Sequence, residues 1–173
     1  MKNSANGKTG KTRIAKELKN AKNLLTILTE GEALRADNLL VSDFNSIFKL
    51  VTDMIYTMQR VGGVGLAASQ VGINLQIAIA LVDRKPLVLI NPVVVGHSDE
   101  QTSIAESCLS CPGQSVRVPR WTWVTVDYYD VKGNKKWIQV DGMNAIVLQH
   151  EIDHILPEGG KLIIDHKETK HED

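Results

Sequence analysis

Gln149-His150-Glu151-Ile152-Asp153-His154 is the stretch of this sequence that most constrains its fold. It places two histidines four residues apart, with a glutamate directly after the first. Residues at i and i+4 share one face of an α-helix, so both imidazoles can reach the same metal ion if the stretch is helical. Glu151 then lies beside the ion and not on it, which is the position of a general base that takes a proton from water.

The residues around this stretch predict a helix from Gly142 to Leu156. Its continuous apolar face is formed by Met143, Ile146, Val147, His150 and His154. Asp141 can cap the start, and Pro157 ends the pattern. Both histidines are therefore expected in the core. The plain alternative is a pair of buried histidines that hydrogen-bond to neighbours, but His-Glu-x-x-His on a capped helix favours a metal.

Length and composition indicate one ordinary globular domain. The chain has 173 residues, of which 43% are apolar and 23% charged, and its net charge is zero. These values suit a domain with a good core and give no global argument for nucleic acid. There is no apolar stretch of membrane-spanning length and no secretory signal, and two cysteines form no disulfide framework. We therefore expect an intracellular, cytoplasmic protein; an organelle or a phage-infected host stays open.

The charge is nevertheless distributed unevenly. Residues 1–22 carry seven basic residues and a single acid, Glu17, whereas the remaining 151 carry 13 basic and 19 acidic residues. We expect residues 1–22 to form a basic flexible tail and residues 23–173 to form a single domain. Weak contact of the tail with an acidic surface is the alternative. A targeting peptide is poorly supported, because such peptides favour Arg and Ser and this segment is rich in Lys.

Other periodic segments complete the expected fold. A second amphipathic helix is predicted from a cap at Ser42 or Asp43 through Arg60. Its buried face would be Phe44, Ile47, Phe48, Val51, Met54, Ile55 and Met58. Leu24–Leu28 reads as an edge strand or a helix end.

Buried strands are predicted at 75–82 and at 86–95, the second broken by Asn91-Pro92. Residues 121–129 and 136–140 read as a β-hairpin around Lys132-Gly133-Asn134, and 161–164 as a last short strand. Because strands and helices do not alternate, we expect an α+β fold. Antiparallel or mixed sheets would pack around the central helix that carries His-Glu-x-x-His, with the second amphipathic helix near the N-terminus.

A glycine-rich stretch, Gly62 to Gln70, lies between the second helix and the first strand. Three glycines within four residues let the backbone approach a ligand closely. A phosphate-binding loop of the dinucleotide type needs a strand before it and a helix after it, and here the order is reversed. A loop that offers its backbone to an extended peptide fits better. A plain turn explains this stretch equally well.

Cys108 and Cys111 form a Cys-x-x-Cys pair. Together with the two histidines, this pair could form a closed Cys₂His₂ structural zinc site. However, 38 residues separate the cysteines from the histidines, whereas roughly a dozen do so in the usual zinc finger. One cysteine with two histidines, leaving the fourth position to water, is instead a catalytic arrangement. A redox pair is the third alternative, disfavoured because no thioredoxin-like βαβ pattern surrounds it.

Three stretches together resemble the motifs of the peptide deformylases, in the same order and at comparable spacing. Residues 63–70 are similar to the family's Gly-x-Gly-hydrophobic-Ala-Ala-x-Gln, residues 106–110 to its Glu-Gly-Cys-Leu-Ser, and residues 149–154 to its Gln-His-Glu-x-Asp-His. The similarity extends from about Leu28 to Asp165. The chain resembles the compact members, which lack the long C-terminal helix. Two differences stand out: Ser107 replaces the usual glycine, and Ile155-Leu156-Pro157 replaces Leu-x-Gly.

The resemblance implies an enzyme that removes the formyl group from the N-terminal formyl-methionine of new polypeptides and releases formate. It implies one divalent metal ion per chain, Fe²⁺ in the cell and often Ni²⁺ or Zn²⁺ in preparations. The implied ligands are Cys108, His150 and His154. Glu151 would act as base and then as acid, while Gln70 and the backbone N–H of Leu109 would stabilise the oxyanion.

The resemblance also implies how the substrate binds. The peptide would lie as an added strand, hydrogen-bonded to the backbone at Val64, Gly65 and Ser107. The methionine side chain would enter an apolar pocket lined by Val64, Ile104, Met143, Ile146 and Val147. Ordinary core packing is the alternative for each apolar residue. Glu106 and Arg120 would form an ion pair behind the metal loop, and Asp153 would orient a ligand histidine.

The partners expected from this interpretation are formyl-methionyl nascent peptides and the ribosome surface, with the chain itself a monomer. A second hypothesis keeps the metal as a structural pin in a catalytically silent module that binds peptides or ribosomes. Glu151 and Gln70 argue against it, because a pin needs neither a base nor an oxyanion donor. A metallopeptidase is the third hypothesis. Its third ligand would lie downstream, where Glu158 is too close and follows a proline.

Overall fold

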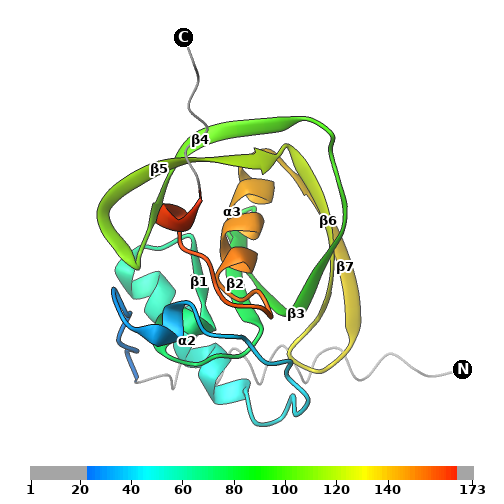
Figure 1. The fold of residues 1–173 in the computed structure, drawn as a ribbon. Helices are drawn as coiled ribbons and strands as arrows, with labels where there is room; N and C mark the ends of the chain where they lie inside the picture. The colour runs from blue at the N-terminus through cyan, green and yellow to red at the C-terminus, as the bar shows by residue number, and fades with distance from the viewer. Residues whose placement is uncertain (1–22, 167–173) are drawn as a thin grey trace, which may run out of the picture.

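The computed structural model describes residues 23–166 of the chain, and its fold is the expected α+β type (Figure 1). The basic segment 1–22, expected to be a tail, lies outside the described residues, as does 167–173. Three short 3₁₀ helices are described: η1 (Glu32–Leu34), η2 (Ala68–Val71) and η3 (Ile163–Asp165). The α-helices of the described part are α2 (Phe48–Val61) and α3 (Gly142–Asp153). The strands are β1 (Gly65–Ala67), β2 (Ile77–Val82), β3 (Lys85–His97), β4 (Gln101–Cys108), β5 (Cys111–Trp121), β6 (Trp123–Tyr129) and β7 (Lys135–Asp141).

The strands form two antiparallel sheets around α3. The larger sheet has the order β1-β2-β3-β6-β7, and β4 pairs with β5 in the smaller one. In Figure 1, α3 runs through the middle of the molecule, with the large sheet curving around one side and the β4–β5 hairpin crossing above. Among the described residues, no helix has the length and apolar character that a membrane crossing needs.

Strand β2 is buried on both faces, which explains its continuous apolar sequence. Side chains alternate along a strand: Ala78 and Ala80 belong to the core cluster that contains α3, whereas Ile77 and Ile79 belong to the cluster that contains α2. The small alanines let α3 approach closely. The sheet therefore separates the two helices. Because α3 packs against the sheet on its apolar side, its polar side chains face the site.

Helix α3 confirms the helix predicted around His-Glu-x-x-His, with two differences at its ends. Asp141 is the N-cap residue, but its side chain makes no capping hydrogen bond. The helix ends at Asp153 and not at Leu156, so that His154 is the C-cap residue, still with right-handed helical dihedral angles. Met143 was expected on the buried face, yet it is 61% exposed at the first turn.

Helix α2 confirms the second amphipathic helix but begins at Phe48, later than the predicted cap at Ser42 or Asp43. Asp43 instead closes a turn: its Oδ1 accepts a hydrogen bond from the N–H of Asn45 at 2.9 Å, and its carbonyl accepts one from the Ser46 hydroxyl. This local side-chain bond competes with helix nucleation. Most of the expected apolar face is buried, including Met54 and Met58, whereas Phe44 and Phe48 are half-buried.

Strand β3 is continuous through Asn91-Pro92, where the sequence predicted a break. Asn91 has a φ of 50°, and the register with β6 shifts between Ile90 and Val93, which marks a bulge. The Asn91 side chain accepts from the N–H of Val41 at 2.8 Å and donates to its carbonyl at 2.9 Å. These bonds replace part of the ladder that the proline cannot join, so the strand bends without ending.

Further expectations about short segments were wrong or incomplete. Leu24–Leu28 has no regular secondary structure, and 161–164 contains η3 and no strand. The stretch from Gly62 to Gln70 is not a loop, because it contains the edge strand β1 and then η2. The β4–β5 hairpin was not predicted at all. The β6–β7 hairpin is confirmed, with Gly133 at a φ of 76° in its turn.

Candidate metal centre

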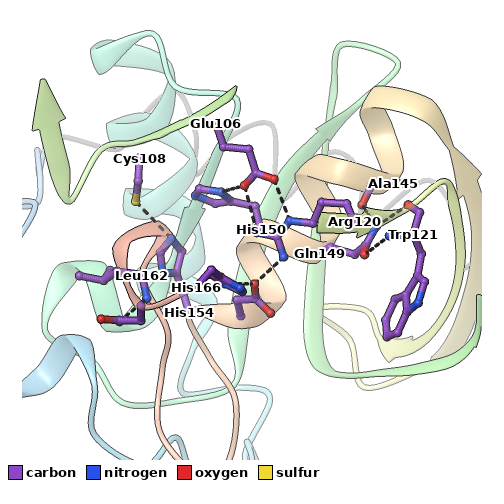
Figure 2. A network of polar contacts seen from close by, with 12 residues as sticks. Glu106, Cys108, Arg120, Trp121, Ala145, Gln149, His150, His154, Leu162 and His166 are labelled. Atoms are coloured by element: carbon purple, nitrogen blue, oxygen red, sulfur yellow. Dashed lines mark hydrogen bonds and ion pairs between the residues drawn. The ribbon is translucent and has the colours of Figure 1, made fainter. Parts of the chain in front are cut away.

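Three side chains that the sequence proposed as ligands lie together in the structure. Cys108, at the end of β4, meets His150 on α3 and His154 at its C-cap, and one ligand atom from each lies within 4.8 Å of the other two. Cys108 Sγ lies 3.3 Å from His154 Nε2 (Figure 2). The Ser69 hydroxyl donates to the carbonyl of His154 at 2.8 Å, which fixes the end of the helix. Both elements are thus held where their donors converge.

Glu106 orients His150. The Nδ1 of His150 lies 2.8 Å from Glu106 Oε2, which leaves Nε2 to face the cluster. A carboxylate that accepts the second ring N–H of a ligand histidine sets its tautomer and makes it a better donor. Asp153, which the sequence suggested for such a role, instead contacts Arg120 and His166. The orienting carboxylate therefore comes from β4, and not from the motif on α3.

Arg120 ties this carboxylate to the helix. It donates to Glu106 through Nε at 2.8 Å and Nη2 at 3.0 Å, and it also pairs with Asp153 (Figure 2). His166 Nε2 lies 2.9 Å from Asp153 Oδ2. Burial raises the pKa of Glu106, but the hydrogen bonds from His150 and Arg120 outweigh it and lower the pKa below its usual value. The carboxylate therefore stays ionised in the folded protein.

Glu151 is the free carboxylate of the site. It is 4% exposed, and its Oε2 has no hydrogen-bond partner among residues 23–166. Burial raises its pKa to about 7, against the opposing positive charges of His150 and Arg120. A base whose pKa lies near the working pH transfers protons most efficiently. The carboxyl group packs directly against Gly65, where any Cβ would collide with it, so the glycine is required for close packing.

Gln70 supplies a fixed amide donor. Its Oε1 accepts from the N–H of Ala67 at 2.9 Å, and its Nε2 donates to Ser110 Oγ at 3.1 Å and approaches Cys108 Sγ at 3.5 Å. The amide is thereby directed at the cluster. Ser110, at the turn between β4 and β5, had no sequence signal as a partner of this amide. Its role depends on the fold bringing η2 against that turn.

A cavity of about 390 Å³ opens beside the cluster. Its wall includes every residue that the sequence proposed for substrate binding: Val64, Gly65, Ile104, Ser107, Met143, Ile146 and Val147. Gln70, Cys108, Leu109, His150 and Glu151 line it as well. Val64 and Met143 are 57% and 61% exposed, so they form an apolar rim at its mouth. His154 does not line the cavity and lies deeper in the core.

Cys111 lies outside the group of ligand atoms. Burial, and then the neighbouring charge of Cys108, raise its pKa to about 11. Because the ligand atoms that converge come from Cys108, His150 and His154, the closed Cys₂His₂ arrangement is not what the described residues form.

The donor set fits a catalytic metal ion. One thiolate and two imidazoles suit Fe²⁺, Ni²⁺ or Zn²⁺, and three protein ligands beside a cavity leave an open position. Glu151, whose Oε2 has no hydrogen-bond partner among the described residues, lines the same cavity, as expected for a group that works on water and not on the fold. Fold and site together define the class of protein: a metal-dependent hydrolase.

Comparison with known proteins gives the family. The family model described as Polypeptide deformylase matches residues 24–173. A peptide deformylase of Baumannia cicadellinicola subsp. Homalodisca coagulata is 44% identical over 125 residues, which cover 70% of this chain and 72% of the relative. One from Endomicrobium trichonymphae is 41% identical over 138 residues, covering 78% and 80%.

Solved structures agree with this match. The crystal structure of peptide deformylase from Thermotoga maritima superposes with a TM-score of 0.78 at 34% identity, covering 83% of this chain and 97% of the other. A peptide deformylase from Synechococcus elongatus in complex with actinonin gives 0.78 at 35% identity, covering 87% and 82%. This chain belongs to the polypeptide deformylase family.

Proposed function

We propose that this chain removes the formyl group from the N-terminal formyl-methionine of newly made polypeptides and releases formate. The observation that carries the proposal is a family match over residues 24–173 together with the cluster of Cys108, His150 and His154, beside a cavity that Glu151 also lines. No observation favours the catalytically silent module with a structural metal. A pin would leave the buried, unpartnered Glu151 carboxylate without a use.

Cys108, His150 and His154 would hold the ion. An ion bound there acts as a Lewis acid and lowers the pKa of water toward neutrality. Glu106 supports this assignment, because its bond to His150 leaves Nε2 available as the donor atom. Fe²⁺ is our choice for the cell, on the strength of the sequence resemblance, with Ni²⁺ or Zn²⁺ in preparations.

Glu151 acts as the general base and then the general acid. It takes a proton from the attacking water and returns it to the amine nitrogen as the formyl C–N bond breaks. Negative charge that develops on the formyl oxygen is met by the Gln70 amide and the backbone N–H of Leu109. The Gln70 amide costs little to reorganise during the reaction, because its oxygen is already fixed by Ala67.

The substrate would extend the large sheet. β1 is an edge strand of that sheet, and Val64, Gly65 and Ser107 all line the cavity. A peptide between these segments can add hydrogen bonds on both sides. Ile104, Ile146 and Val147 give the apolar wall for the methionine side chain. We further propose that the chain is a cytoplasmic monomer with residues 23–173 as one domain, and that it meets nascent peptides at the ribosome surface.

The test is formate release from a formyl-methionyl tripeptide by protein loaded with Ni²⁺. Glu151→Gln should retain about one ion per chain and lose at least about 10²-fold in kcat, because a positioned base contributes 10²–10⁴-fold. Glu100→Gln, an exposed carboxylate between β3 and β4, is the matched control and should leave kcat unchanged. Metal-loaded protein without any turnover would support the silent module.

A further inference from the structure

Cys111 lies in the site region, and the proposed mechanism leaves it unused. β4 ends at Cys108 and β5 begins at Cys111, and the two residues are directly paired across the turn Leu109-Ser110. The register shifts immediately beyond, between Glu106 and Cys108, so this pairing belongs to the tip of the hairpin. The two cysteines are the only ones in the chain.

The two thiols are placed as disulfide partners would be. Opposed residues of an antiparallel pair have Cα atoms about 4.5–5.5 Å apart, inside the range of about 4.4–6.8 Å that a disulfide bridges. Both side chains point into the same buried cluster, with Leu34, Val118, Leu162 and Ile163. The pairing and the shared cluster therefore place the two cysteines side by side at the tip of the hairpin.

We propose that Cys108 and Cys111 form a reversible disulfide when the site meets a peroxide, which makes the hairpin tip an oxidative modification site. The inference rests on the proposed function only for its consequence, since a disulfide at Cys108 removes a metal ligand. The bond itself depends only on the placement of the two thiols.

A peroxide can reach one of the two sulfurs more easily than the other, and this difference decides which cysteine is oxidised first and which one then reacts with it. Cys108 lines the cavity, whereas Cys111 does not and is 3% exposed within apolar surroundings. A peroxide entering through the cavity therefore reaches Cys108 first. Cys111 needs no access to solvent, because it reacts with the sulfur beside it and acts as the resolving thiol.

The chemistry balances in two steps. The Cys108 thiol loses its proton, and the thiolate attacks one peroxide oxygen: an S–O bond forms, the O–O bond breaks, and the product is a sulfenic acid and hydroxide, which takes up that proton to give water. The Cys111 sulfur then attacks the Cys108 sulfur: an S–S bond forms, the S–O bond breaks, and the departing hydroxide leaves as water with the Cys111 proton. Two thiols and one hydrogen peroxide become one disulfide and two waters.

The consequence is protection of a ligand that would otherwise be destroyed. A sulfenic acid without a nearby thiol proceeds to sulfinic and sulfonic acids, which thiol reductants do not reverse. Capture by Cys111 stops the oxidation at a stage that such reductants do reverse. The site then loses its ion on oxidation and recovers it after reduction.

The test treats the Ni²⁺-loaded chain with hydrogen peroxide. Metal content and formate release are measured beforehand, so that failure of the proposed function is seen separately. We expect loss of both titratable thiols, an intact mass lower by two hydrogens, release of Ni²⁺ to a chromogenic chelator, and recovery of Ni²⁺ binding after dithiothreitol. Proteolytic mapping without reduction should find the hairpin tip cross-linked. A mass increased by oxygen with the Cys111 thiol still free, or disulfide-linked dimers alone, would overturn the proposal.

Cys111→Ala is the matched variant. It should bind Ni²⁺ like the unaltered chain, because Cys111 is outside the ligand group, but under peroxide it should gain oxygen atoms and fail to recover with dithiothreitol. Equal recovery in the variant would show that Cys111 protects nothing. Should the variant fail to fold, the mass and thiol count of the unaltered chain still decide the question.

Discussion

Gly65→Ala isolates how much the reaction depends on the position of Glu151. An added Cβ at Gly65 would lie 2.6 Å from Glu151 Cγ and closer still to the carboxyl group. Because carbon atoms pack at about 3.5–4.0 Å, Cγ must move by about 1 Å. A misplacement of about 1 Å costs about 10²-fold in rate, or about 2.7 kcal/mol in the activation free energy. We expect kcat to fall by about that factor.

The assay compares kcat, KM and Ni²⁺ content of Gly65→Ala with those of the unaltered chain. Gly96→Ala is the control, because its Cβ would meet only ordinary contacts at 3.6–3.7 Å on β3. The ion should stay bound in both variants, since the three atoms nearest to an added Cβ at Gly65 all belong to Glu151 and not to a ligand. A Gly65→Ala protein with metal bound and kcat within about threefold of normal would refute the reasoning, because the base would then tolerate displacement.

Three further predictions concern stability. Arg120→Met leaves the buried Glu106 carboxylate without its main partner, and should lower the free energy of unfolding by about 3–5 kcal/mol in urea titrations; an unchanged midpoint would contradict this. Burial raises the pKa of Asp165, but hydrogen bonds from Arg35 and the Leu162 N–H outweigh it and lower the pKa. Its stabilisation is therefore present above the unfolded pKa of about 3.9 and lost as pH falls through the lower folded pKa; Arg35→Ala should weaken this loss in acid denaturation curves. Removing the ion with a chelator should lower Tm, and adding Ni²⁺ should restore it, because only the folded chain gathers the ligands; a Tm indifferent to the ion would argue against a bound metal.

The sequence predicted the elements in which one periodicity dominates. Helices α2 and α3 followed from apolar residues at helical spacing, and β6–β7 from alternation around a glycine turn. The start of α2 was wrong because Asp43 is equally suited to capping a helix or closing a turn, and only the surrounding fold selects the turn. At Asn91-Pro92, hydrogen bonds between the Asn91 side chain and the Val41 backbone stabilise the bulge, so the strand continues. The expectation that proline interrupts a strand takes no account of such bonds.

The β4–β5 hairpin was missed because it carries almost no hydrophobic signal. Most of its residues are exposed or half-buried on both faces, and buried positions such as Glu106, Cys108, Val118 and Arg120 are mostly polar or reactive. Such a hairpin is not specified by burying an apolar face. It is specified by contacts with α3 and η3 that residue patterns do not report.

For the site, motif spacing and family resemblance predicted which residues would be the three ligands and which would line the cavity. This was possible because His150 and His154 share a helix face and the other motifs flank it. The contacts that support the ligands were harder to predict from the sequence. The pairing of Glu106 with Arg120 was expected, but the bond from Glu106 to His150 and the contact of His166 with Asp153 were not. Each joins residues from different elements, so no spacing along the chain encodes it.

The buried Arg120–Glu106 pair explains why the site holds together. A buried ion pair is weak evidence for stability, since well-packed apolar residues often serve as well. Its place is informative, however: Glu106 and Arg120 come from β4 and β5, while their other partners, His150 and Asp153, belong to α3. An isolated two-stranded hairpin is at best marginally stable, so docking through this network is what brings Cys108 to the histidines. The ion, which needs donors from both elements, then stabilises the same contact. Metal binding and hairpin docking are therefore linked, and loss of the ion should loosen β4–β5 before it disturbs the large sheet.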